Sequence, residues 1–496
     1  MRNVREFFIS ALLGAVVWLM LLGSPAAAAG SAAASHGDPF ALVFEVFAIL
    51  LICAIVGRYG ARKLKQSPVL GELVIGIIVG AIMYQLASPT ITIIRHSELI
   101  GQATSRALNE QISLPEATRA ALKNANLPED QAQKLGQVVL RPDIPRKLLL
   151  ARAIQLFSSL GVILLLFMVG LECSLEEMAA VGGRATGVAL IGMVAPLVLG
   201  LMAIKLLFPA ADPNVPIFVG ATLSATSIGI TSRVFRDMNK LDLSEAKIVL
   251  GAAVIDDVLG LILLAVVIGI ATGGQIAFST VGLILFKAAL FLGGVIFFGL
   301  IFLKKQIAFF TRLDQSTIRL LYPFSLLLLC SWLADTMGLA TIVGAFAAGL
   351  IIKEEYFPTN EACHFEGQEI RSVLAPLESI FSPIFFVLMG FQVDATTFFD
   401  PSVLLTGLVL TLVAVLGKLA ASLWLGPGDD KLIVGLGLNP RGEVGLIFAS
   451  IGKAIGVLDS NLFSTVIVVV LLTTLMTPPL LKWAIERRER RNICAL

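Results

Sequence analysis

Two adjacent aspartates, Asp256 and Asp257, lie near the middle of a long apolar stretch that runs from Ala246 to Ala271. A charged side chain at bilayer depth carries a large desolvation cost, so such residues are retained mostly for function or for ion pairing. Neighbouring residues of a helix point about 100° apart. The two carboxylates therefore cannot share one proton and must face different partners.

Lys418 lies in another apolar stretch, at nearly the same depth as Asp256. When depth is counted from the midpoint of each stretch, the two residues differ by no more than about one helical turn. A buried lysine needs an opposite charge, which makes Asp256 its expected partner. The alternative is that Lys418 extends its side chain to the inner membrane surface, about two turns away.

Residues 220–232 interrupt a third apolar stretch with glycines and hydroxyl-bearing side chains, among them Thr226 and Ser227. Paired interruptions in two parts of a hydrophobic chain are typical of transporter sites built from discontinuous helices. Their exposed carbonyls and hydroxyls can replace the hydration shell of a small cation. The competing interpretation is that Thr226 and Ser227 bond the preceding turn or allow close helix packing.

The second interruption, residues 435–445, lies at the same level of another apolar stretch and includes Pro440, Arg441 and Glu443. Proline removes a backbone donor from the helix and glycine loosens it. We interpret Arg441 and Glu443 as a supporting network. A local clamp across the broken helix explains them somewhat better than direct contact with an ion does.

The composition identifies a membrane as the setting of these residues. Of 496 residues, 57% are hydrophobic and 15% are charged, and the mean hydropathy is +0.90. A soluble domain carries about 25% charged residues, so a soluble enzyme and a disordered chain are excluded. The net charge of +2 also excludes a nucleic-acid partner. The five cysteines and three histidines are scattered, so no metal centre and no cofactor are expected.

Thirteen stretches have the roughly 20 apolar residues needed to cross about 30 Å of hydrocarbon. They begin near Phe40, Val69, Ile154, Ala185, Val215, Ala246, Phe278, Leu320, Leu339, Val373, Val403, Leu432 and Leu462. Arginine and lysine fall almost entirely in alternate short loops, which places the mature N-terminus outside and the C-terminus in the cytoplasm. We therefore predict an all-α polytopic membrane protein with thirteen transmembrane helices.

Four regions are predicted along the chain. Residues 1–29 have the basic start, apolar run and small-residue end of a cleaved signal peptide. Residues 40–484 form the membrane domain. Within it, residues 88–151 mix helix-forming residues with prolines and are predicted to be an extracytoplasmic helical insertion. Residues 485–496 form a basic cytoplasmic tail.

Taken together, these patterns resemble the monovalent cation:proton antiporter-2 family, and within it the NapA-like sodium/proton antiporters. The resemblance runs in order through nearly the whole span of residues 40–484. The double aspartate followed by a membrane lysine is its specific part. The matching words are Val69-Leu-Gly-Glu-Leu-Val-Ile-Gly, Leu160-Gly-Val-Ile-Leu-Leu-Leu-Phe-Met-Val-Gly-Leu-Glu172, Ala225-Thr226-Ser227, Ile255-Asp256-Asp257, Phe381-Ser-Pro-Ile-Phe-Phe, Gly417-Lys418 and Pro440-Arg-Gly-Glu-Val-Gly.

The resemblance implies a fold of inverted repeats in a homodimer, in which a core domain with two discontinuous helices slides against a dimerisation domain. It also implies that Asp257 binds either the transported alkali cation or a proton. Asp256 would pair with Lys418, and Thr226 and Ser227 would line the site. Relatives that release potassium commonly carry Gln-Asp at the double aspartate and a cytosolic nucleotide-binding domain, so that form of control is not expected here.

The function predicted from these observations is secondary antiport of a monovalent cation against protons, by elevator-type alternating access. Sodium is the favoured cation, with potassium and lithium as alternatives. A gated potassium channel or a potassium efflux system on the same scaffold is the rival interpretation. An aspartyl intramembrane protease is disfavoured because its two acids must converge from separate helices.

Overall fold

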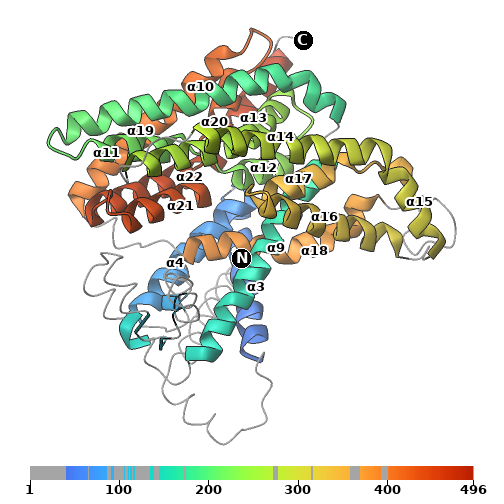
Figure 1. Ribbon diagram of the computed structural model, residues 1–496, viewed down its shortest axis with the longest axis horizontal. Helices are drawn as coiled ribbons and strands as arrows, with labels where there is room; N and C mark the ends of the chain where they lie inside the picture. Colours follow the sequence, from blue (N-terminus) through green and yellow to red (C-terminus); the bar gives the residue numbers. More distant parts are fainter. Residues whose placement is uncertain are drawn as a thin grey trace, which may run out of the picture. The chain divides into compact units, whose positions relative to one another are not determined.

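The computed structural model describes residues 41–64, 66–86, 91–93, 106, 110, 112–113, 116–117, 135–138, 144–172, 175–271, 278–313, 317–357, 369–391 and 400–494. Within these residues all regular secondary structure is helical (Figure 1). The predicted signal peptide, residues 1–29, lies outside the described residues. So does most of the predicted insertion, residues 88–151, whose described parts include short helical pieces at residues 91–93 and 135–138.

Ten segments of the described chain are long and apolar enough to cross a membrane. They lie on α3 (Ala41–Lys63), α4 (Pro68–Gln85), α9 (Ile144–Glu172), α10 (Leu175–Leu207), the pair α11 (Asn214–Ser224) and α12 (Ile228–Asp237), α14 (Phe278–Ile301), α16 (Ile318–Thr336), α18 (Ile370–Phe391), α19 (Pro401–Ala421) and α22 (Ser460–Cys494). The chain is therefore an all-helical, multi-pass membrane protein.

The other three predicted membrane stretches also lie on helices. One is α13 (Ser244–Ala271), the second is α17 (Thr341–Ile351), and the third is divided between α20 (Lys431–Gly437) and α21 (Gly442–Ala454). Of these, α13 has 28 residues, α17 has only eleven, and α20 and α21 are separated by a break. That all thirteen stretches cross the membrane stays a prediction.

The chain divides into two compact units. The first comprises Met1–Ser159, Pro383–Thr406 and Ala449–Val468. Within it α3 packs closely on α4, because a Cβ atom on Gly71 would lie only 2.0 Å from the carbonyl oxygen of Gly57. Beside this contact Arg58 binds Glu72, which is fully buried. The ion pair lets the carboxylate of Glu72 lie in the packed interior of this unit.

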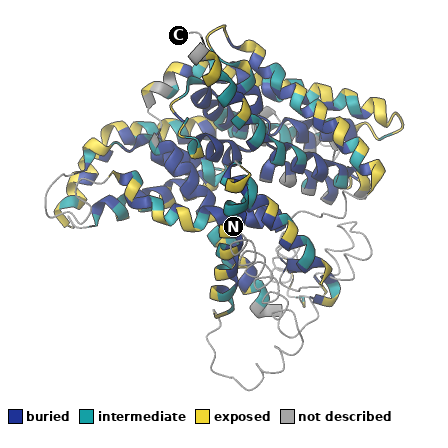
Figure 2. Cartoon of the chain, turned by 180° about the vertical axis from the view of Figure 1, so that it is seen from behind, coloured by how far each residue is buried: buried dark blue, intermediate teal, exposed yellow. Residues whose placement is uncertain are grey.

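The second unit comprises Leu160–Ser382, Gly407–Phe448 and Val469–Leu496. Here α10 packs along α11 and α13, and the remaining elements include α15 (Leu303–Leu313), η1 (Glu354–Tyr356) and η3 (Ser422–Trp424). Nearly all of α11 and α12 is buried, whereas most of α14 is not; Figure 2 shows buried residues where helices pack and exposed ones on their outer sides. The two helices that carry Thr226 and Ser227 at their junction are thus interior elements.

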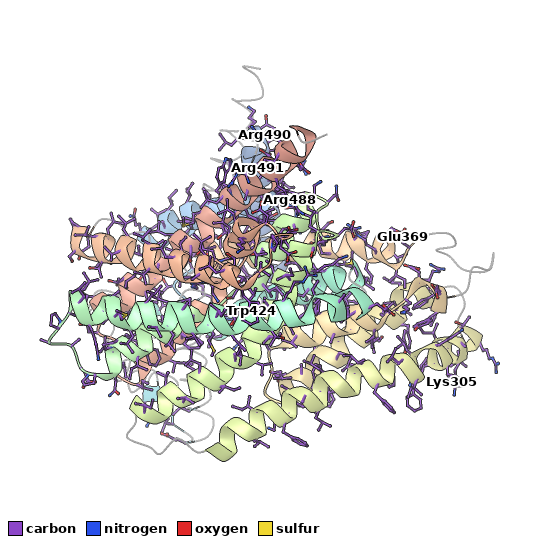
Figure 3. The ribbon with its side chains drawn as sticks, turned by 90° about the horizontal axis from the view of Figure 1, so that it is seen from above. Lys305, Glu369, Trp424, Arg488, Arg490 and Arg491 are labelled. Carbon is purple, nitrogen blue, oxygen red and sulfur yellow. The ribbon has the colours of Figure 1, made fainter. Side chains whose placement is uncertain are left out.

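The basic C-terminal end is joined to the rest of its unit by ion pairs. Figure 3 shows Arg488, Arg490 and Arg491 at the end of α22, and Arg488 binds the buried carboxylate of Glu245 at the start of α13. Glu245 also accepts a 2.8 Å hydrogen bond from the backbone N–H of Asp430. The described part of the predicted tail, residues 485–494, continues α22 as helix.

Candidate ion-binding site

The first helix break separates α11 from α12 at residues 225–227. Ala225 and Ser227 both have extended ψ angles, 144° and 114°, so the helix cannot continue through them. In the last turn of α11, the hydroxyls of Thr222 and Ser224 donate to backbone carbonyls four and three residues earlier, at 2.9 and 2.7 Å. The carbonyl of Ala221 is one of those that the end of the helix leaves without a backbone donor, and the Ser224 hydroxyl occupies it.

The second break separates α20 from α21 and contains Pro440. Here the fully buried guanidinium of Arg441 supplies the donors that the broken helix lacks. It donates to the carbonyls of Leu438 at 3.2 Å and Asn439 at 2.9 Å, and to that of Ala414 on α19 at 3.3 Å. Arg441 therefore joins the end of α20 to the neighbouring helix. The side chain of Glu443, its predicted companion, lies outside the described residues.

The two breaks meet through their backbones. The N–H of Ser227 donates to the carbonyl of Pro440 at 2.8 Å, and the hydroxyl of Thr231 on α12 donates to the carbonyl of Gly437 at 2.6 Å. Gly442 has a φ of +40°, and a Cβ atom there would lie 2.4 Å from the Ser227 hydroxyl oxygen. Only glycine at position 442 lets the two broken segments of the backbone approach this closely.

A buried ion pair lies next to this crossing. The ammonium Nζ of Lys418 is 2.9 Å from Oδ2 of Asp256, and the hydroxyl of Thr226 donates to the same oxygen at 2.5 Å. Lys418 is fully buried, so in this structure its side chain does not extend to the membrane surface. Thr226, Asp256 and Lys418 are thus brought together from the first break, α13 and α19.

Asp257 lies one residue further along α13 and is less buried than Asp256. This difference agrees with the divergence of adjacent helical side chains. Among the described residues, no group of three or more His, Cys, Asp or Glu side chains could hold a metal ion. An alkali cation at this place would be a transported substrate and not a resident metal.

A second buried charge cluster was not predicted. Glu378 on α18 binds Arg233 of α12 and lies 3.1 Å from Arg236 Nη2. Arg233 also donates to the hydroxyl of Ser382 at 3.1 Å and to Asp237 at 3.0 Å. None of these charged residues was among the site residues predicted from the sequence. The sequence did offer one sign of this cluster: Glu378 is an acidic residue within an apolar stretch, and a buried carboxylate needs a cation as a partner.

Polar side chains of α22 form the other group that the sequence analysis missed. Thr474 Oγ1 accepts a 3.3 Å hydrogen bond from the N–H of Gly442, and Thr477 Oγ1 accepts a 3.2 Å hydrogen bond from the side-chain amide of Asn439. Three threonines within one and a half turns of an apolar helix, 473, 474 and 477, were a visible sign of a polar neighbour. All three are buried.

The chain matches a known protein family over most of its length. The model of a family described as "Sodium/hydrogen exchanger, transmembrane" matches residues 47–486. Among curated proteins, the chain is 34% identical to the high-affinity Na⁺/H⁺ antiporter NhaS3 of Synechocystis sp. over 458 residues, which cover 90% of each protein. It is 31% identical to the Na⁺/H⁺-K⁺ antiporter GerN of Bacillus cereus, over 67% of this chain and 84% of GerN.

The fold is also that of a solved antiporter. The sodium proton antiporter MjNhaP1 from Methanocaldococcus jannaschii, at pH 8, superposes with a TM-score of 0.54 at 16% sequence identity, covering 90% of this chain and 98% of that one. At this identity the likeness concerns the fold alone. Together with the family match, these findings show that the chain belongs to the sodium/hydrogen exchanger family and is an integral membrane antiporter, a secondary active transporter and not an enzyme.

Proposed function

We propose that this antiporter exchanges sodium for protons and that Asp257 is the carboxylate that binds either ion. The observation that carries the proposal is the crossing of two broken helices directly beside the paired aspartates. Breaks of this kind bring backbone carbonyls and hydroxyls to membrane depth, where they can replace the water around a cation. Thr226 and Ser227 lie at the crossing and are the proposed neutral ligands.

The two aspartates have different environments, and this supports different roles for them. Asp256 Oδ2 receives both the Lys418 ammonium and the Thr226 hydroxyl, and both donors stabilise the charged carboxylate. Asp256 thus has the character of a fixed charge that neutralises the buried lysine. Asp257 is the more exposed acid and is the better candidate for exchange with an ion from solution.

Competition at one carboxylate is enough to couple the two fluxes. Partial desolvation raises the affinity of an aspartate for a proton, and a cation can bind once the proton has left. If the empty carboxylate is disfavoured during the conformational change, each crossing of the membrane carries either a proton or a cation. We propose elevator-type alternating access as that change, with Arg441 and Glu443 supporting the broken helix.

The assignment to a subgroup of the family rests on short sequence motifs and not on the fold. We propose a member of the cation:proton antiporter-2 group of NapA-like type, with thirteen membrane helices in inverted repeats, a core and a dimerisation domain, and assembly as a homodimer. The N-terminus would lie outside after cleavage of residues 1–29, and the tail, residues 485–496, in the cytoplasm. Residues 88–151 would form an extracytoplasmic insertion within the membrane domain, residues 40–484.

Potassium remains the alternative cation, because one relative carries K⁺ as well as Na⁺ in its name. Reconstituted vesicles with an internal pH-sensitive dye distinguish the cases when sodium, lithium or potassium is added in turn. We expect sodium to move protons with the highest apparent affinity. A channel would pass cations with no fixed ratio to protons, so simultaneous cation and proton flux measurements separate it from an antiporter.

Asp257→Asn tests the proposed carrier and has the largest effect that we predict. An amide cannot exchange a proton for sodium near neutral pH, so exchange should fall to background for every cation while the protein stays folded. The matched control is Asp335→Asn, which changes an exposed aspartate on α16. Sodium/proton exchange at the wild-type rate in the Asp257→Asn protein would refute the mechanism.

The same preparation tests competition. If cation and proton share one carboxylate, the apparent sodium affinity should weaken about tenfold for each pH unit below the pKa of the site. Initial rates across a series of pH values and sodium concentrations measure this slope. An apparent affinity that does not change with pH would mean that the two ions bind at separate places.

A further inference from the structure

Asn439 lies at the second helix break, one residue before Pro440, and is fully buried. Its backbone is engaged on both sides: its N–H donates to the carbonyl of Leu436 at 3.2 Å, and its carbonyl accepts from Arg441. The side chain is therefore not needed to complete the hydrogen bonds of the break. Its orientation has to be explained in another way.

The hydrogen bonds of α22 fix which end of the amide faces that helix. The hydroxyl of Thr477 donates its proton to the carbonyl of Thr473 at 2.7 Å. A hydroxyl has only one proton, so Thr477 Oγ1 can only accept from other groups. The atom of Asn439 that lies 3.2 Å from it must then be the donor Nδ2 and not the oxygen. Oδ1 consequently lies on the other side of the amide from Thr477.

Within the described part of the chain, Oδ1 of Asn439 has no hydrogen-bond donor. Burying an amide oxygen without a partner is unfavourable, and an apolar side chain of the same size would avoid that cost. An acceptor that is held in this orientation therefore indicates a ligand. Nε of Arg441 likewise lacks an acceptor among the described residues, so a water molecule between these two groups is the rival explanation.

The position of Asn439 connects it to the ion-binding site. The carbonyl of the next residue, Pro440, accepts the N–H of Ser227. The residue before Ser227, Thr226, donates to Asp256. Asn439 therefore precedes Pro440, whose carbonyl joins the two breaks by accepting from Ser227. Ser227 in turn follows Thr226, which donates to the Asp256 carboxylate of the ion pair.

We propose that Asn439 Oδ1 is a ligand of the transported cation and that Asn439 contributes to cation selectivity; the inference rests on the proposed function. Small hard cations prefer oxygen ligands, and an amide oxygen provides one without adding charge. It therefore strengthens cation binding and leaves the proton affinity of the carboxylate nearly unchanged. This separation gives the proposal a kinetic signature that a purely structural role does not have.

The decisive variant is Asn439→Leu, which keeps the size of the side chain and removes its polar atoms. We expect the apparent KM for sodium to rise by about tenfold, the loss of one favourable ligand interaction. The maximal rate at saturating sodium should stay unchanged, and so should the pKa obtained from the pH dependence of the sodium KM. The rise in melting temperature that sodium gives the wild-type protein should shrink in parallel. Asn461→Leu, at an exposed asparagine near the start of α22, is the matched control.

A second variant keeps the test decisive if Asn439→Leu does not assemble. Thr477→Val removes the acceptor that orients the amide but leaves Asn439 in place, so it should raise the sodium KM in the same direction by a smaller factor. An unchanged sodium KM in the assembled Asn439→Leu protein overturns the proposal and favours a water molecule as the partner of Oδ1. A shift of the pKa obtained from the pH dependence of KM, together with the rise in KM, overturns it too, because the residue would then act through the carboxylates.

The inference and the proposed function fail in different experiments. If wild-type protein moves no protons on addition of sodium, or if Asp257→Asn exchanges normally, the proposed function is wrong. If the wild type and Asp257→Asn behave as expected and Asn439→Leu binds sodium normally, only the role of Asn439 is wrong.

Discussion

Each of the two helix breaks leaves backbone carbonyls without helical donors, and different side chains bond these carbonyls at the two breaks. At the first break, the neutral hydroxyl of Ser224 donates to a carbonyl at the end of α11, and the carboxylate of Asp256 lies beside Thr226, just before α12 begins. At the second, the guanidinium of Arg441 occupies the carbonyls at the end of α20. A helix N-terminus favours a negative charge and a C-terminus favours a positive one, so each break carries the charge that its helix end prefers.

This difference indicates that the two breaks have different roles in the protein. The first is lined by small side chains that can give or accept one bond each, which suits a place where an ion enters and leaves. The second is fixed by three hydrogen bonds from one rigid cation, which joins α20 to α19 through Ala414. We therefore expect a change of Arg441 to reduce stability mainly, and changes of Thr226 or Ser227 to alter exchange mainly.

Arg441→Leu should give the larger loss of stability. It leaves three buried carbonyls without their donor, and we expect a loss of about 4–6 kcal/mol in the free energy of unfolding. Thermal unfolding of the detergent-solubilised protein measures this. Arg312→Leu, at an exposed arginine of α15, should cause little change. If Arg441→Leu were as stable as the wild type, the guanidinium would not be what holds the second break.

Lys418→Gln should have an intermediate effect. Removing one partner of a buried ion pair costs about 3–5 kcal/mol, and protonation of Asp256 should reduce the loss to about 2–3 kcal/mol. Stability should then fall more than the chemistry of exchange. If Lys418 itself carries a second proton, the variant should instead keep exchange and lose its response to voltage. Melting temperature and voltage-driven exchange on the same preparation separate these outcomes.

Gly442→Ala should have the smallest effect of the three and should couple the two breaks. Strain at a positive φ together with contact on Ser227 should cost about 1–3 kcal/mol. Ser227→Gly removes the contacting hydroxyl, so the double variant should recover part of the stability that Gly442→Ala loses. A double-mutant cycle of melting temperatures measures this coupling. Strictly additive effects would show that the close approach has no energetic consequence.

Much of the site could be predicted because charge, proline and glycine are unusual inside apolar stretches. Asp256, Asp257, Lys418 and both breaks were found in this way, and the structure brings Lys418 to Asp256. The family and its antiport function also follow from such patterns.

What could not be predicted depends on which helices become neighbours. The bonds from Arg233 and Arg236 to Glu378 require knowing that α12 faces α18. The orientation of the Asn439 amide depends on a proton that Thr477 gives to its own helix. The apolar stretch that begins near Leu339 was predicted at full membrane length, but α17 within it has only eleven residues, fewer than a membrane crossing needs.

The hydrogen bond between the N–H of Ser227 and the carbonyl of Pro440 is made by main-chain atoms on both sides. Proline cannot donate, but it accepts as well as any residue. Side chains at positions 226, 227 and 439 can therefore change over generations without removing the bond that joins the helices. If these side chains bind the ion as proposed, a lineage can change its ion selectivity and keep the same contact between the two helix breaks.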